Sequence, residues 1–310
     1  MKVKAEDIKR VKAMGCLFNR GTDDEFNVRV ITKNGVLTGK QLHNIAAAAE
    51  QYGSGTVTFT TRLTVEIPGV HYESIPAVQK HLADDGLETG GTGAKVRPVV
   101  ACKGTTCVFG LIDTQKIAEE IHDRFYTGYR DVTLPHKFKI AVGGCPNNCV
   151  KPDLNDFGMI GQHAPAPDPE ICRGCKKCIV EANCLMHAAK VVDGKIKIDD
   201  DLCNACGKCI RNCYFQSIAG KQHGVKILIG GKWGREGRKG SALSGIYSVE
   251  EAMDILERAL LVFRKYAYQK ERFGAMVERL GHDQVEAMLL SDAIMAEKDA
   301  ILSAPIRTKK

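Results

Sequence analysis

The chain has 310 residues, of which 44% are hydrophobic, which suits one large domain or two to three small ones with packed cores. The formal net charge is +7, but the 44 Lys and Arg residues are dispersed, without the basic block and interleaved aromatic residues typical of nucleic-acid binding. No apolar run approaches the roughly 18 residues that span a membrane. The segment Met1–Asp7 lacks the apolar core of a secretory signal, so we expect a cytoplasmic protein without nucleic-acid or membrane partners.

The N-terminal third alternates between strand and helix signals. Residues 1–24 are predicted to be polar and mostly irregular, and Cys16 within them is expected to be a small buried side chain. The expected elements are a strand over Phe26–Ile31, a helix capped by Thr38 and running to Tyr52, strands over Thr56–Thr60 and Leu63–Ile67, and a helix over Tyr72–Leu82. This α+β pattern predicts a domain over residues 1–92, ending in a flexible Gly90–Gly93 link.

A second domain is predicted to be interrupted by an insert. Its expected elements are a strand over Val99–Ala101, a helix over Asp113–Phe125, strands over Lys137–Val142 and Val225–Ile229, a helix opened by the Ser248/Glu251 capping box, and a helical tail over residues 271–300. Three prolines in His163–Pro169 predict a linker. The boundaries that follow are residues 93–164 and 221–310 for this domain and 165–220 for the insert.

Thirteen cysteines demand an explanation. Twelve of them fall into three sets of four, and the odd total argues against a disulfide scaffold. The insert holds two CxxCxxC runs, each with a trailing cysteine. In two-cluster bacterial ferredoxins the trailing cysteine binds the other cube, which predicts the ligand sets Cys172, Cys175, Cys178, Cys213 and Cys203, Cys206, Cys209, Cys184. Zinc would leave a third cysteine of each run idle.

The remaining set comes from two distant segments, Cys102-Lys-Gly-Thr-Thr-Cys107 and Gly144-Cys145-Pro-Asn-Asn-Cys149. Four thiolates hold one [4Fe–4S] cube. The sequence therefore predicts three [4Fe–4S] clusters. Two belong to the ferredoxin-type insert, and the third is held by segments of a second domain, which a ferredoxin does not need.

These segments carry a resemblance to a known family. Together with Thr60-Thr61-Arg62 and Ile229-Gly-Gly-Lys232, they resemble the siroheme-dependent sulfite and nitrite reductases, and most closely the small subunit of anaerobic sulfite reductase, which has a ferredoxin insert at this place. The matching stretches run from about Phe26 to Arg279. The first cysteine pair departs from the pattern, with four intervening residues where the family usually has five. The resemblance implies a single sulfite/nitrite reductase repeat: a ferredoxin-like half domain and a siroheme/[4Fe–4S] domain, with the insert as a third domain.

The resemblance also implies roles for individual residues. The cube of Cys102, Cys107, Cys145 and Cys149 is coupled to siroheme, and Cys149 is the bridging thiolate. The residues implied to bind the anionic substrate are Arg29, Arg62, Lys137 and Lys139, and those implied to bind the cofactor besides Cys149 are Arg97, Asn147, Lys232 and Arg235. His136 and His163 are weaker candidates: the favoured interpretation is an ordinary polar histidine, and a proton donor is the alternative.

The function implied is reduction of sulfite to sulfide by six electrons that arrive through the two insert clusters. Nitrite or another small oxyanion is an alternative substrate, and a three-cluster electron carrier without siroheme, or a protein that binds siroheme without turnover, are alternative functions. No nicotinamide or flavin fingerprint is present, so electrons are expected from a ferredoxin or a flavin/iron–sulfur subunit. Larger family members contain the repeat twice, which implies that this chain pairs with itself or with a related subunit.

Overall fold

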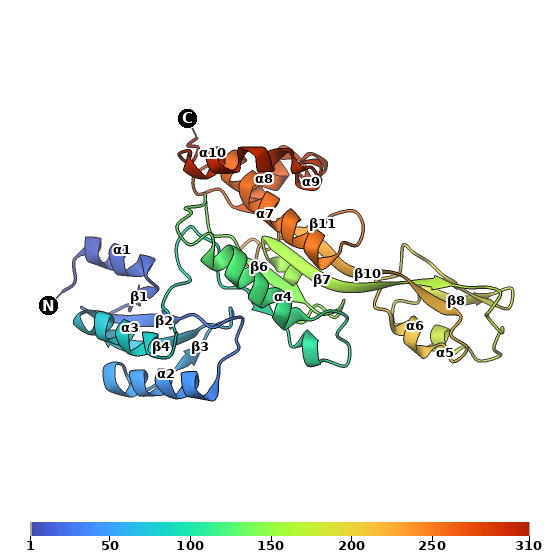
Figure 1. Ribbon diagram of the computed structural model, residues 1–310, viewed down its shortest axis with the longest axis horizontal. Coiled ribbons are helices and arrows are strands. Elements are labelled where there is room, and N and C mark those ends of the chain that lie inside the picture. The colour runs from blue at the N-terminus through green and yellow to red at the C-terminus, as the bar shows by residue number, and fades with distance from the viewer. Residues whose placement is uncertain (1, 310) are drawn as a thin grey trace. The chain divides into compact units, whose positions relative to one another are not determined.

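The computed structural model describes residues 2–309, which form two compact units (Figure 1). The first unit comprises Met1–Ala101, Ala118–Ala141 and Glu257–Lys310. The second unit comprises Cys102–Ile117 and Val142–Leu256 and contains the whole insert. The three predicted domain boundaries stay predictions, since this division groups the insert with its neighbours.

The N-terminal part of the first unit is an antiparallel sheet of order β1-β2-β4-β3 with helices. Its elements are α1 (Ala5–Ala13), β1 (Cys16–Phe18), β2 (Glu25–Val30), α2 (Gly39–Tyr52), β3 (Thr58–Phe59), β4 (Val65–His71), η1 (Tyr72–Ser74) and α3 (Ile75–Ala83). The expectation that residues 1–24 are mostly irregular was wrong, because they form α1 and the edge strand β1. The two strands predicted over Thr56–Thr60 and Leu63–Ile67 have different bounds in the structure. β3 is only two residues long, and β4 begins at Val65 and continues to His71.

The other predicted elements of this part are confirmed, because short-range interactions and the alternation of apolar residues determine them. The Thr38 hydroxyl accepts a hydrogen bond from the Gln41 backbone, and the Gln41 side chain accepts one from the Thr38 backbone, so the predicted helix start is confirmed. Along β2 the side chains of Phe26, Val28 and Val30 are fully buried on one face. Cys16 is also fully buried, and burial raises the pKa of its thiol to about 12, which confirms a packing role.

The rest of the first unit is mainly helical. Its elements are the π-helical turn η3 (His122–Thr127), α8 (Phe273–Leu280), α9 (His282–Leu290), η5 (Asp292–Glu297) and α10 (Lys298–Ser303). Three fully buried rings, those of Phe138, Phe263 and Phe273, pack with centroids 5.1 to 5.7 Å apart. This aromatic core anchors the segment just before β6 (Ile140–Gly143). Since β6 begins at Ile140, Lys137 and Lys139 lie just before the strand that was predicted to contain them.

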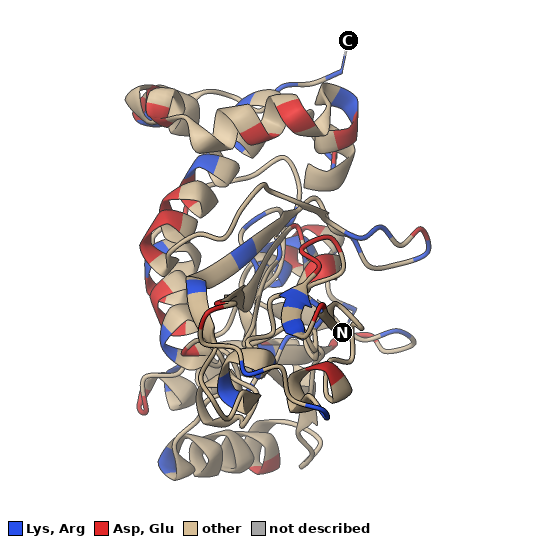
Figure 2. Ribbon diagram, turned by 90° about the vertical axis from the view of Figure 1, so that its right-hand side faces the viewer, with Lys and Arg blue, Asp and Glu red and all other residues tan. Residues whose placement is uncertain are grey.

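Two helices extend across the boundary between the units along the chain. The predicted helix over Asp113–Phe125 appears as α4 (Thr114–Ile121), which continues into η3. Helix α7 (Val249–Tyr266) begins at the predicted capping box, where Ser248 and Glu251 exchange hydrogen bonds of 2.7 and 3.1 Å. Figure 2 shows Lys and Arg interspersed with Asp and Glu along the ribbon.

The second unit is built on a long antiparallel ribbon of β7 (Phe157–Pro167) and β10 (Ile218–Ile229). In the five-stranded sheet the order is β11-β10-β7-β6-β5, with β5 at Val100–Ala101 and β11 at Ser241–Ala242. The predicted linker at His163–Pro169 was wrong, because these residues continue β7 as far as Pro167. Pro165 and Pro167 lie opposite Gly220 and Ile218 of β10, and the bulge that follows Gly220 is a place where a strand tolerates proline.

The ribbon leads directly into the insert, as Figure 1 shows from β7 and β10 to α5, α6 and β8. The insert contains α5 (Ile179–Ala182), the hairpin β8 (Ala189–Val192) and β9 (Lys195–Ile198), and α6 (Lys208–Asn212). Its small core consists of Val180, Ala189, Ile196 and Ile218, with cysteine side chains packed around them. Outside the insert, the short 3-10 turn η2 (Gly104–Thr106) lies between Cys102 and Cys107, and η4 (Pro152–Leu154) follows Cys149.

Candidate functional site

The outer thiol set consists of Cys172, Cys175, Cys178 and Cys213, which together line one small cavity of the insert. Backbone N–H groups of Gly174 and Ile196 lower the pKa of the Cys172 thiol. Burial opposes ionisation of Cys213, but hydrogen bonds from Ser217, whose hydroxyl lies 3.1 Å from the sulfur, outweigh it and lower its pKa. Donors of this kind favour the thiolate, which is the form that binds metal.

The inner thiol set consists of Cys184, Cys203, Cys206 and Cys209, and these four line a second cavity of about 290 Å³. Burial raises the pKa of Cys209 to about 11 and also raises that of Cys203, so these thiols stay protonated until a metal displaces the proton. The same cavity is lined by Cys145, Pro146 and Asn147 from the segment outside the insert. The structure thus brings the inner set beside the GCPNNC segment.

The central thiol set consists of Cys102, Cys107, Cys145 and Cys149. The pKa of Cys145 is raised by burial and by its electrostatic interaction with the other three thiols, which places all four within one local field. The backbone N–H of Gly144 donates to the Cys102 sulfur over 3.1 Å. Cys149 is the exposed member of this set.

Two glycines explain how the distant cysteine segments approach each other. A Cβ atom on Gly104 would lie 2.9 Å from the Gly144 Cα, and one on Gly144 would lie 2.8 Å from the Gly104 Cα. Any side chain at either position would push the two segments apart. Thr114 strengthens the contact by donating from its hydroxyl to the Cys102 carbonyl over 2.6 Å.

The spacing of the thiols is informative about what they can hold. Among residues 2–309 no three His, Cys, Asp or Glu side chains are grouped closely enough to bind one metal ion. A single zinc ion needs sulfur ligands at about 2.3 Å. The inner and outer sets each line one cavity, and four thiolates are the ligand set of one [4Fe–4S] cube.

Asn147 and its neighbour differ in their surroundings. Asn147 is exposed at the inner cavity, as expected for a residue that faces a bound group. Asn148 adopts a left-handed backbone conformation with φ of 56°, and its amide donates to Asp153 over 2.9 Å. The buried Oδ1 of Asn148 has no hydrogen-bond partner. Asn148 is thus a second polar residue of interest in this motif, and the sequence analysis named only Asn147.

The two cofactor-binding cations predicted after β10 lie on a loop. The backbones of Lys232 and Arg238 exchange hydrogen bonds of 2.8 Å, which close the loop. The Lys232 ammonium lies 3.6 Å from the Glu236 carboxylate, and Arg235 is exposed. Neither side chain lines the inner or the outer cavity.

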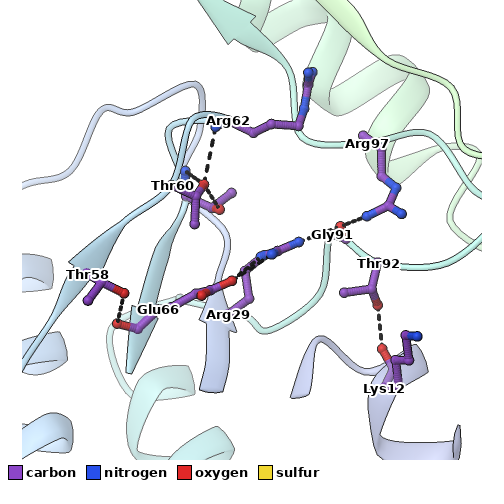
Figure 3. Close-up of polar contacts among 10 residues, drawn as sticks. Lys12, Arg29, Thr58, Thr60, Arg62, Glu66, Gly91, Thr92 and Arg97 are labelled. Carbon is purple, nitrogen blue, oxygen red and sulfur yellow. Dashed lines mark hydrogen bonds and ion pairs between the residues drawn. The ribbon is translucent and has the colours of Figure 1, made fainter. Parts of the chain in front are cut away.

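In the first unit two arginine side chains meet at the Gly91 carbonyl, and other basic side chains lie close enough to interact with them. Arg29 donates to this oxygen over 3.1 Å, and Arg97 donates to it as well (Figure 3). Gly91 is buried with φ of 74°, so the expectation of a flexible Gly90–Gly93 link was wrong. We call Arg29, Arg97, His136, Lys137 and Arg272 the cation cluster.

Electrostatics within the cation cluster are unfavourable for its members. Burial, followed by Arg29 and Arg272, lowers the pKa of Arg97 to about 10, and the buried Arg97 Nε has no hydrogen-bond partner. Burial, followed by Arg272 and Lys137, lowers the pKa of His136 to about 4. Its Nδ1 accepts a hydrogen bond from the Lys137 backbone, which suits a neutral ring. A donor set of this kind suits the binding of an anion.

The four predicted anion-binding residues have different surroundings. Arg29 forms an ion pair with Glu66 at 2.6 Å, which offsets its charge. Arg62 donates to the carbonyl oxygens of Pro98 and Ile140. Lys137 belongs to the cation cluster, whereas Lys139 lies half-buried just before β6.

Arg272 was missed because residues 271–300 were interpreted as a charged helical tail. Its position is unusual only once the start of the helix is known. It directly precedes α8, at the N-cap position. The helix dipole disfavours a cation there.

Comparisons with known proteins agree with this arrangement. The family profile described as "Nitrite and sulphite reductase 4Fe-4S domain" matches residues 92–293, and "Nitrite/Sulfite reductase ferredoxin-like half domain" matches residues 19–85. The chain belongs to the nitrite and sulphite reductase family. The family resemblance and the α+β fold class, with a ferredoxin-like half domain and a 4Fe–4S domain, are thereby confirmed.

Two relatives come from Methanocaldococcus jannaschii. A coenzyme F420-dependent sulfite reductase is 33% identical over 264 residues, 84% of this chain but 41% of the relative. An uncharacterised protein is 30% identical over 281 residues, 87% of this chain and 95% of the relative. The chain thus spans about two fifths of the first relative and nearly all of the second.

Among solved structures, dissimilatory sulfite reductase I matches with a TM-score of 0.70 at 21% identity, over 93% of this chain and 73% of that chain. The NirA protein of Mycobacterium tuberculosis matches with a TM-score of 0.65 at 17% identity, over 99% of this chain and 49% of that chain. At these identities the likeness shows the fold alone. Within residues 2–309, no helix combines the length and the apolar character that crossing a membrane requires.

Proposed function

We propose that the protein is a siroheme- and iron–sulfur-dependent oxidoreductase that reduces sulfite to sulfide. The observation that carries the proposal is the shared cavity in which Cys145 of the central set meets the four thiols of the inner set. A family site for oxyanion reduction then lies next to a supply of electrons. Sulfite rather than nitrite is favoured by the coenzyme F420-dependent sulfite reductase of M. jannaschii at 33% identity.

The chain's own residues fit the groups that the family binds. The central set would hold one [4Fe–4S] cube, with Cys149 as its link to siroheme, and the inner and outer sets would hold one cube each. When bound, siroheme and its cube supply the iron that takes the oxyanion and the electrons that reduce it. The unpartnered Arg97 Nε and the excess positive charge around it fit the carboxylates of such a cofactor or the oxyanion itself.

The thiol sets define an order for electron flow. The conversion of sulfite to sulfide needs six electrons, and a cube passes on one at a time. The outer set shares no cavity residue with the central set, whereas the inner set shares its cavity with Cys145. With clusters bound, the inner set would therefore be the link between the outer set and Cys145 of the central set.

Cations have the second task, which is to bind and orient the oxyanion. Arg62, Lys137 and Lys139 are proposed for this role together with Arg29, whose charge is already shared with Glu66. His136 is neutral at pH 7 because its pKa is about 4, so it is a hydrogen-bond partner rather than a charged proton donor. Fixed donors of this kind stabilise charge without reorganisation.

Nitrite is the second candidate substrate. A ferredoxin–nitrite reductase of Leptolyngbya laminosa is 29% identical over 162 residues, although these cover 49% of this chain. The same cations and the same electron supply suit both oxyanions. Steady-state assays with each substrate, driven by reduced methyl viologen, distinguish them by the ratio of kcat/KM.

We also propose that the chain works as an oligomer or beside a related subunit. It carries one repeat, and a relative of 26% identity from Nitratidesulfovibrio vulgaris is the beta subunit of a dissimilatory-type sulfite reductase. Light scattering on the cofactor-loaded protein tests this proposal. A fully active monomer would contradict it.

The function is tested on anaerobically purified protein by its iron and siroheme content and its sulfite turnover. We expect about twelve cluster irons per siroheme and release of sulfide. Cys149→Ser should abolish turnover and change the siroheme absorption spectrum, while the inner and outer clusters stay reducible. Protein that is fully loaded with iron but lacks any tetrapyrrole band would refute the enzyme function and leave an electron carrier.

A further inference from the structure

The outer thiol set lies at the surface of the insert. Of the eight cysteines of the insert, all of them described, Cys175 is the one classed as exposed. The residues between the ligands of this run include three cations, Arg173, Lys176 and Lys177, all of them exposed. A cluster held here would have one corner close to solvent and surrounded by positive charge.

Large apolar side chains are exposed in the same part of the insert. They flank the cysteines in the sequence and are 44 to 87% exposed: Ile171, Ile179, Tyr214 and Phe215. Phe215 and Arg173 both line the outer cavity, so the aromatic and the basic residues meet at one place. The rings of Tyr214 and Phe215 pack edge to face with centroids 5.2 Å apart. Exposed apolar groups gathered among charges are typical of a protein–protein interface.

The inner set has a different environment. Its four cysteines are only partly exposed, and the segment before Cys203 carries the exposed acidic residues Asp199, Asp200 and Asp201. Its cavity also faces Cys145 of the central set. Lys208 and Arg211 also line the inner cavity, so the two sets differ mainly in position: the inner set faces the central set, whereas the outer set has an exposed cysteine among exposed cations.

We propose that the outer face, defined as Ile171, Arg173, Cys175, Lys176, Lys177, Ile179, Tyr214 and Phe215, docks an acidic ferredoxin-type electron-donor protein. This inference rests on the proposed function, since it assigns the surface through which the reductase is reduced. In the docked complex the reduced donor loses one electron and the oxidised outer cube gains it. No bond forms or breaks. Complementary charges would steer the encounter and make its rate depend on salt.

The chain offers a matched control for a charge-reversal test. Lys190 of β8 and Lys197 of β9 are directly opposite each other in the hairpin, and both are exposed. Their neighbours Val191 and Ile196 line the outer cavity, so the two lysines point to the other face of the hairpin. Replacing this pair changes the net charge as much as replacing Lys176 and Lys177, but away from the outer face.

The experiment compares Lys176→Glu/Lys177→Glu with Lys190→Glu/Lys197→Glu in the fully loaded protein. The probe is a purified, reduced, acidic plant-type [2Fe–2S] ferredoxin, and stopped-flow absorbance gives the second-order rate of cluster reduction at low and high salt. We expect the first variant to lose roughly tenfold or more in rate at low salt together with most of its salt dependence. The control should change less than about threefold. Iron content and reduction by methyl viologen should be unchanged in both.

An equal loss in both variants would overturn the proposal, because net charge rather than the outer face would then steer the ferredoxin. An unchanged rate in the first variant would overturn it too. Tyr214→Ser offers a second check, since removing an 87% exposed ring is not expected to disturb folding but should slow reduction by ferredoxin. The assay is independent of sulfite. A protein whose clusters accept electrons at the outer face but which does not turn over sulfite would refute the proposed function and leave the docking surface standing.

Discussion

Arg97→Met is the substitution in which stability and function are expected to move in opposite directions. The guanidinium is largely buried next to Arg29 and Arg272, and these surroundings lower its pKa from 12.5 to about 10. The group still carries its charge at pH 7, so the folded state is destabilised by it. Methionine has a similar length and no charge. We therefore expect the variant without siroheme to be more stable than the wild type.

The magnitude follows from the surroundings of Arg97. A lowering of this size corresponds to roughly 3 kcal/mol of unfavourable interaction in the folded state. The substitution also removes the hydrogen bond from Arg97 to the Gly91 carbonyl, and this loss offsets about 1 kcal/mol of the gain in stability. That oxygen keeps Arg29 as a donor at 3.1 Å, so it is not left unpaired. A net gain of about 2 kcal/mol would raise the Tm by about 4 to 8 °C in a domain of 150 to 250 residues.

The assay is thermal unfolding of protein produced without siroheme, followed by measurement of siroheme content in protein produced with it. Arg130→Met is the control, because Glu88 raises the pKa of Arg130 and its removal should bring no gain in Tm. We expect Arg97→Met to raise the Tm and to lower siroheme loading or affinity for sulfite. A lower Tm would refute the electrostatic argument. A higher Tm with unchanged loading and unchanged KM would show that the charge does not serve a bound anion.

Three further predictions concern other sites. Burial opposes ionisation of Glu257, but Lys298 and other hydrogen-bond donors outweigh it and lower its pKa to about 2, so Glu257→Gln should cost about 3 kcal/mol at pH 7. Because the folded pKa is depressed, this difference in Tm should be complete above about pH 4.5 and should shrink as the pH falls toward 2. Gly144→Ala should remove about four irons per chain, measured by iron analysis, because its Cβ would lie 2.8 Å from the Gly104 Cα; full iron content would contradict this. Cys213→Ser should keep the siroheme band but lose turnover driven by ferredoxin, and retained turnover would mean that the outer cluster is not on the path.

Local signals in the sequence predicted most of the thiol chemistry. The CxxCxxC spacing fixes three sulfurs on one loop, and the structure places each of the two predicted insert sets at one cavity. The capping boxes at Thr38 and Ser248 were also confirmed, because both bonds of a capping box lie within four residues. The ligand assignments themselves stay predictions until clusters are observed.

Long-range features could not be predicted in this way. Helix α1 is polar for most of its length and buries little besides Val11, so few apolar positions mark the face that packs against the core. The prolines of β7 resemble a linker until β10 is known to pair with them. Arg272 joins Arg97 and His136 across more than a hundred residues of sequence, and no local pattern signals that meeting. In each case the deciding interaction comes from a distant part of the chain.

The distinction between an enzyme and an electron carrier depends on the first unit. All twelve cysteines of the three sets belong to the second unit, and a carrier with three clusters would need nothing more. The cation cluster of the first unit has no task in such a carrier, although it holds Arg97 partly unsatisfied at a cost in stability. A bound anion would offset that cost by supplying the missing acceptor and the opposite charge. The electrostatics of Arg97 therefore favour a protein that binds an anionic cofactor or substrate over one that only transfers electrons.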